Sequence, residues 1–295
     1  MKKIIPTGLA LVLLSGCIHH TQSPPPVHLN TAYKNALLMR FLDSVSVNAE
    51  HEQRIKVFYE QILEAQSAQK PIRMIRYHID QRYLGQTVNM HKTGLGIMYW
   101  PNGSLYIGQW RYDRRVGEGY LLSLDDNRAL VSTYQGQWLD DKANGKGSLK
   151  LANGNYFEGQ FVDNKKEGEG AYTWASGEFA GDRFEGLYKN NLRAGPGTYT
   201  WADGSQHTGK WVDGLREGDA TTIWANGQRY QGEYKNDKRT GQGVKEWPNG
   251  VRYEGAFKDG LAHGRGVKSN DKGESCLGMW EQDQLVGECL AGEKL

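Results

Sequence analysis

Hydrophobic residues near the start of the chain recur at helical spacing. Leu37 and Phe41 belong to one such run, in residues 31–43, and a second run covers residues 46–69. Apolar side chains spaced three and four residues apart form one face of a helix. We therefore expect two amphipathic helices, the second ended by Pro71.

From residue 83 onward the hydrophobic period becomes two, and a longer repeat appears. Numbered from its opening position, the unit has Gly at positions 3 and 12 in all nine copies, and Gly at position 14 in seven. Six of the eight intervals between units are 23 residues, and the others are 28 and 27. The units start at Tyr83, Tyr106, Tyr134, Phe157, Phe184, His207, Tyr230, Tyr253 and Cys276.

The aromatic residues of the repeat predict a short strand. Positions 1 and 5 are aromatic in most units, with Gly between them, while positions 2 and 4 carry polar residues such as Glu158 and Gln160. This alternation indicates a sheet with one aromatic face and one wet face. All nine tryptophans fall at position 5 (Trp110, Trp138, Trp211, Trp280) or position 18 (Trp100, Trp174, Trp201, Trp224, Trp247).

Turn signals divide each unit into a β-hairpin. Most units end in Asn-Gly or Asp-Gly, as at Asn249-Gly250, and these dipeptides predict a type I′ turn. A first turn centred between positions 8 and 9 would place position 5 opposite 12 and position 3 opposite 14. The bare glycines would then let large rings lie flat over the backbone, which offsets the weakening that Gly causes in a strand.

This pattern of Y-x-G-x-W, G-x-G and a closing N-G or D-G resembles the MORN repeat family over residues 83–295. The resemblance implies a mainly β fold: an elongated, single-layer antiparallel sheet of nine stacked hairpins, the last one partial, here preceded by an α-helical hairpin. It also implies a scaffold for protein association, with phospholipid binding sometimes proposed. The chain departs from the pattern at Thr87, His207, Ala220, Cys276 and Cys289, and in insertions near residues 123–133 and 178–183.

The first 17 residues, MKKIIPTGLALVLLSGC, resemble a bacterial lipoprotein signal. The resemblance implies cleavage of residues 1–16 and lipidation, with palmitate among the acyl groups, of Cys17. Ile18 after the cysteine implies an outer-membrane lipoprotein facing the periplasm of a Gram-negative cell. Residues 17–27 form a Pro-rich tether.

Residues 28–82 form the helical N-terminal region. The sheet has an exposed end there, and an open edge strand invites aggregation. We therefore expect the helices to cap that end of the sheet, with a dedicated partner-binding helix as the alternative.

Charge and motifs exclude several functions. Removing Lys2 and Lys3 from 36 basic residues leaves 34, against 34 acidic ones, which argues against nucleic acid as a partner. The Gly-x-Gly pairs lack the strand-turn-helix context of a nucleotide site, and no nucleophile-base or paired-carboxylate arrangement recurs. We expect no enzymatic activity, cofactor or metal, including at His19 and His20.

The final unit has cysteines at positions 1 and 14. Cys276 and Cys289 would be diagonal neighbours on one face of the hairpin, so a disulfide needs a local bulge or register shift. Export would place them in an oxidising compartment, and with Cys17 lipidated they are the only thiols left to pair. The sequence is compatible with two alternatives, a disulfide between these residues or two buried free thiols.

Two functions remain in competition. The first is a lipid-anchored envelope scaffold that binds envelope proteins or itself. The second is a module that binds glycan, peptidoglycan or phospholipid through its aromatic rows. Tryptophan rows buried by neighbouring repeats favour the scaffold, whereas rows lining an open groove favour the ligand-binding module.

Overall fold

The computed structural model describes residues 31–66, 70–77 and 80–291. The predicted signal segment, Cys17, the tether, His19 and His20 therefore lie outside the described residues. The helices are α1 (Thr31–Asp43) and α2 (Ala49–Glu64), and the strands are β1 (Ile72–Arg76), β2 (Arg82–Val88), β3 (His91–Tyr99), β4 (Leu105–Arg111), β5 (Arg114–Leu124), β6 (Leu130–Leu139), β7 (Lys142–Leu151), β8 (Tyr156–Val162), β9 (Lys165–Thr173), β10 (Arg183–Lys189), β11 (Leu192–Thr200), β12 (Gln206–Val212), β13 (Leu215–Ile223), β14 (Arg229–Lys235), β15 (Lys238–Glu246), β16 (Arg252–Lys258), β17 (Leu261–Ser269), β18 (Ser275–Glu281) and β19 (Gln284–Ala291).

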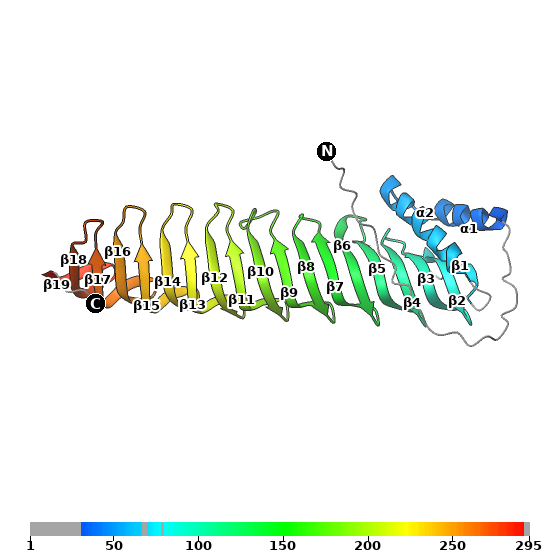
Figure 1. Cartoon of the computed structure of the whole chain (residues 1–295). Helices are drawn as coiled ribbons and strands as arrows, with labels where there is room; N and C mark the ends of the chain where they lie inside the picture. Colours follow the sequence, from blue (N-terminus) through cyan, green and yellow to red (C-terminus); the bar gives the residue numbers. More distant parts are fainter. Residues whose placement is uncertain (1–30, 67–69, 78–79, 292–295) are drawn as a thin grey trace, which may run out of the picture.

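All nineteen strands belong to one open antiparallel sheet, and its long axis runs across the strands (Figure 1). Each strand pairs with its neighbours in the chain, so β2 to β19 form nine consecutive hairpins and β1 adds an edge strand beside β2. This confirms the predicted fold class. The first insertion lengthens β5 and β6 to 11 and 10 residues, with a register shift after Ser123, and the second lengthens the loop between β9 and β10. Neither interrupts the strand pairing.

The register within a hairpin agrees with the prediction at one pair and not at the other. Gly232 lies opposite Gly243, so position 3 does face position 14. Position 5 was predicted opposite position 12, which is wrong, because Tyr234 lies opposite Arg239 at position 10. A bulge after Gly232 shifts the register, and position 12, Gly241, instead lies opposite the next unit.

The type I′ turns also lie elsewhere than predicted. They occupy positions 7 and 8, as at Asn236 and Asp237, with φ values of 47° and 67°. At Asn249-Gly250 only the glycine has positive φ, 79°. There the Gly250 N–H donates to the Trp247 carbonyl at 3.0 Å, closing a type I turn before a left-handed Gly. The unit-ending loop therefore holds three residues, and an Asn-Gly pair serves it equally well.

The two helices begin and end close to the predicted residues, although α2 stops at Glu64, well before Pro71. The side chain of Asn48 caps α2 by accepting a hydrogen bond from the His51 N–H at 2.9 Å. Within the described residues, no helix combines the length and apolar character needed to cross a membrane. The helical region predicted for residues 28–82 also contains strand β1.

The helices cover a face of the sheet, while β1 covers the edge of β2 (Figure 1). This corrects two expectations: the cap is formed by a strand as well as helices, and the second face is not wet throughout. Apolar residues replace polar ones on that face of the first units and pack against Phe41 and Ile55 of the helices. These buried residues include Leu84, Ile97, Leu105, Ile107 and Leu122. Farther along, β14 alternates buried and exposed side chains as predicted.

Candidate functional site

The aromatic face of the sheet forms its own core. Rings at positions 1 and 5 pack edge to face, both within a unit and between units. Tyr230, for example, contacts Tyr234 at 5.4 Å and Phe257 of the next unit at 5.0 Å between ring centroids. These rings are at most 7% exposed, from Tyr83 to Trp280. A single layer can therefore bury its apolar groups because each ring lies over the next hairpin.

Glycine at position 14 leaves room for the ring at position 1. A Cβ at Gly243 would lie 2.6 Å from the hydroxyl oxygen of Tyr230, a distance that forces something to move. The two departures from Gly at this position are Ala220 and Cys289. Each occurs in a unit whose first residue is not Tyr or Phe but His207 or Cys276. Ring size and the absence of a side chain at position 14 are therefore coupled.

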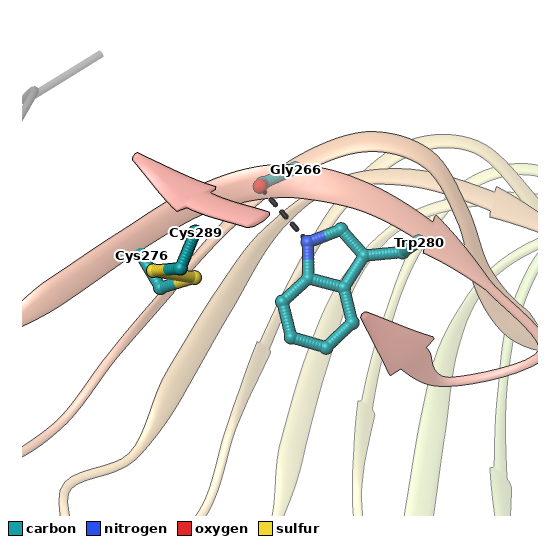
Figure 2. Close-up of a disulfide and its surroundings, with 4 residues drawn as sticks. All are labelled: Gly266, Cys276, Trp280 and Cys289. Carbon is teal, nitrogen blue, oxygen red and sulfur yellow. Dashed lines mark hydrogen bonds between the residues drawn. A yellow bond between two sulfur atoms is a disulfide. The ribbon is translucent and has the colours of Figure 1, made fainter. Parts of the chain in front are cut away.

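The structure separates the nine tryptophans into two groups. The four at position 5 are 3–7% exposed. Each donates its indole N–H to a glycine carbonyl of the preceding unit, as in Trp280 to Gly266 at 3.0 Å (Figure 2). The five at position 18 are half-buried: Trp100, Trp174, Trp201, Trp224 and Trp247. Only the second group presents ring surface to a ligand or partner.

A row of cations, which was not predicted from the sequence, crosses the aromatic face. Position 10 is basic in six units, and we call these residues the cation row: Lys92, Arg115, Lys166, Arg193, Arg216 and Arg239. Each lies over aromatic rings; the Arg216 guanidinium carbon is 5.1 Å from the centroid of Tyr234. The recurrence of Lys or Arg at this position was the signal in the sequence.

Three members of the cation row pair with an aspartate at position 8 of the following unit. The Arg216 Nε donates to Asp237 Oδ1 at 3.0 Å, and the same guanidinium donates to the Asp237 carbonyl at 2.9 Å. Arg115 and Asp141 repeat this arrangement. Lys92 lies 3.5 Å from Asp113. The pairing connects consecutive hairpins, because the cation lies on a strand of one hairpin and the aspartate lies in the turn of the next hairpin.

His207 replaces a ring at position 1, as predicted, and is fully buried. Its Nδ1 lies 2.8 Å from the Thr222 hydroxyl, which in turn lies 2.7 Å from the Tyr234 hydroxyl. Its Nε2 has no hydrogen-bond partner among the described residues. Burial, together with the positive charge of Arg216, lowers the pKa of His207 to about 4. The imidazole is therefore neutral at pH 7.

The terminal hairpin carries the predicted pair of cysteines (Figure 2). Cys276 lies opposite Ala291, so Cys289 is its diagonal neighbour, and a register shift follows Leu277. A disulfide joins the two residues, whose Cα atoms are 5.3 Å apart. Among the described residues, no group of His, Cys, Asp and Glu could hold a metal ion.

These features define a class: a single-layer β-hairpin repeat protein with an aromatic core and a capped N-terminal end. The MORN repeat matches residues 91–105, 106–127, 134–156, 157–179, 184–206, 207–229, 230–252 and 253–274. The chain belongs to the MORN repeat family. The structure adds the hairpin of β2 and β3, which begins before the first match, and the disulfide-bearing hairpin after the last.

Similar solved structures are remote. A mutant TCP10 domain of Danio rerio CPAP is 13% identical, with a TM-score of 0.40, covering 75% of this chain and 99% of its own. The SAS-4 (dCPAP) TCP domain of Drosophila melanogaster, solved with a proline-rich motif of Ana2, is 10% identical, with a TM-score of 0.31 and coverages of 70% and 88%. No curated protein matches the chain.

Proposed function

We propose that this chain is a lipid-anchored scaffold of the cell envelope, which binds envelope proteins or further copies of itself through its MORN array. The repeat architecture indicates a protein-binding or membrane-association module. The observation that carries the scaffold over a ligand groove is the burial of the rings at positions 1 and 5. Because these rings form the core, they are not available to stack on sugars.

The anchor in this proposal rests on the sequence from Leu14 to Cys17. Lipid on Cys17 would hold the array at the outer membrane on its periplasmic side. The proposal assigns no catalytic reaction to the chain. Its surface for partners comprises the half-buried tryptophans at position 18, the cation row and the exposed polar face of the later units.

Crosslinking in cells, followed by identification of the captured species, tests the scaffold. We expect proteins or a second copy to be captured with wild type, and recovery of glycan or lipid alone would contradict the scaffold. Fractionation tests the anchor. Cys17→Ala should leave the membrane fraction, whereas its retention there would show that the anchor is wrong.

A second candidate is binding of glycan, peptidoglycan or phospholipid. The specific observation that favours it is the half-buried row at position 18, whose rings remain open on one side. Trp201→Ala and Trp224→Ala separate the two functions. If the row binds glycan, retention on purified peptidoglycan should fall while the melting temperature stays nearly constant; if it serves only packing, the melting temperature should fall and retention should not change.

A further inference from the structure

Three members of the cation row have no aspartate at position 8 of the following unit. The residue at position 8 of the following unit is Asn191 for Lys166, and glycine for Arg193 and Arg239. A cation is present at position 10 in each case, yet none of the three forms an ion pair with a carboxylate among the described residues. Such a half-buried cation loses part of its hydration, and the aromatic rings beneath it and, for Arg193 and Arg239, one glycine carbonyl replace that hydration without supplying a negative charge.

Two of these unpaired cations lie in consecutive units with a tyrosine between them. Lys166 lies on β9 and Arg193 on β11, and Tyr188 lies on the intervening strand β10, directly opposite Arg193. The Lys166 Nζ is 5.4 Å from the centroid of the Tyr188 ring. Strands two steps apart place the two side chains about 10 Å from each other along the sheet.

The hydroxyl of Tyr188 is a buried donor without an acceptor. The residue is 5% exposed, and its hydroxyl oxygen has no hydrogen-bond partner among the described residues. Two units later the equivalent hydroxyl, of Tyr234, is bonded to Thr222. Arg239 lies opposite this Tyr234, whose hydroxyl is already bonded, and position 5 of the following unit is Phe257, so neither ring offers Arg239 an unbonded hydroxyl. The combination of two unpaired cations and an unused hydroxyl therefore occurs at one place in the described array.

Neighbouring groups do not neutralise these cations. Burial lowers the pKa of Lys166 below its ordinary value, and burial likewise lowers that of Arg193. Asp182 accepts the hydroxyl of Tyr199 and the N–H of Ala202, and it forms no ion pair with Arg193 in the described structure. Within the part of the chain that the structure describes, the guanidinium of Arg193 donates one hydrogen bond, to the Gly214 carbonyl at 2.7 Å.

We infer that Lys166, Tyr188 and Arg193 form a binding site for the carboxylates of an acidic segment of a protein partner. In the units of Lys92, Arg115 and Arg216 a carboxylate of the chain itself fills the corresponding place, as Asp237 does for Arg216. A carboxylate is also the group whose two oxygens match a guanidinium. An extended acidic segment can contact both cations when its acids are about three residues apart, since three residues span about 10 Å.

This inference deepens the proposed scaffold by specifying the chemistry of its partner. It is tested with a blocked synthetic peptide, three repeats of Glu-Gly-Gly, against the same peptide with Gln for Glu, by calorimetry at low salt. Wild type should bind only the Glu peptide. Lys166→Gln and Arg193→Gln should each weaken binding about tenfold or more, since a charge-assisted hydrogen bond contributes at least about 1.5 kcal/mol.

The most discriminating variant places an aspartate at position 8 beside Lys166. Asn191→Asp supplies Lys166 with the carboxylate found at position 8 elsewhere, so it should also weaken peptide binding about tenfold while keeping the fold. Asn190→Asp is the matched control, because the same charge is added one residue away, where the side chain accepts from Lys165 at 3.1 Å. Asn190→Asp should bind nearly as wild type.

Arg216→Gln tests specificity, because its cation is already paired. It should change peptide binding less than twofold. A loss equal to that of Arg193→Gln, or binding by Asn191→Asp at wild-type strength, would overturn the site. So would binding of phosphatidylglycerol vesicles, or of inorganic phosphate, that Lys166→Gln and Arg193→Gln abolish and that the Glu peptide does not displace.

The peptide assay is independent of the anchor and of any native partner. Failure of the peptide to bind would therefore remove this site and leave the crosslinking result standing. Absence of captured proteins in cells, with peptide binding intact, would remove the scaffold and leave the site.

Discussion

His207 and Ala220 offer a direct test of how ring size is coupled to the position opposite. His207→Tyr restores the common ring at position 1 while Ala220 still carries its Cβ. In the unit of Tyr253, a Cβ at the equivalent Gly266 would lie 2.3 Å from the tyrosine hydroxyl oxygen. The restored tyrosine should therefore collide with Ala220 in the same way. Overpacking of this kind costs about 1–3 kcal/mol, so we expect His207→Tyr to destabilise by about 2 kcal/mol.

The double variant should reverse the loss. With Ala220→Gly added, the tyrosine has room to donate its hydroxyl to the carbonyl of Lys210, as Tyr230 does to that of Glu233 at 3.1 Å. That bond contributes about 1 kcal/mol, and it replaces a buried imidazole nitrogen that lacks a partner. The free energy of unfolding should return to the wild-type value or exceed it, giving a coupling of about 2 kcal/mol or more.

Urea unfolding followed by tryptophan fluorescence measures all four proteins of this cycle. Gly243→Ala, beneath Tyr230, is the matched control and should lose about 2 kcal/mol by the same contact. A double variant as unstable as His207→Tyr alone would refute the explanation.

The remaining predictions concern the core, pH, shape and thiols. Trp211→Ala should lower the free energy of unfolding in urea by about 3–5 kcal/mol, and Trp224→Ala, at a half-buried ring, should lower it clearly less. Equal losses would contradict the division of the tryptophans into a buried and a half-buried group. Because His207 has a pKa of about 4 when folded and 6.5 as its ordinary value, the unfolded chain binds more protons, so stability should fall from pH 6.5 to 4 by about 3 kcal/mol, but not in the double variant above. Small-angle scattering should show a rod of about 80 Å rather than a globule with a radius of gyration of about 19 Å. Intact-mass measurement after non-reducing alkylation should find Cys276 and Cys289 unlabelled.

The repeat made the fold predictable, because Gly and aromatic positions recur with the same spacing in every unit. The geometry of the turns was harder to predict from the sequence. Asn-Gly suits both a two-residue and a three-residue loop. The bulge after Gly232 arises because Gly232 pairs with Gly243 whereas Glu233 pairs with Thr240 across the hairpin. No single unit displays that information.

Some features of the candidate site could likewise be predicted from the sequence, and others could not. The tryptophan rows were visible in the sequence, but their separation into buried and half-buried groups depends on which strand each ring covers. The missing aspartates at Asn191 and Gly214 became informative only when the structure showed that position 8 faces the cation of the preceding unit. The apolar residues Leu84 and Ile107, which depart from the polar positions of later units, were a signal of the helical cover.

Because each strand of the described sheet pairs with the strands before and after it, the pairing predicts how the array unfolds under force. A force applied between the two ends of the array acts parallel to the inter-strand hydrogen bonds. The strand pairs would therefore separate one after another rather than all at once. The chain would lengthen in near-equal steps, each releasing one 23-residue unit, or about 70 Å of extended backbone beyond its folded width. The disulfide between Cys276 and Cys289 would shorten the step in which the C-terminal unit unfolds.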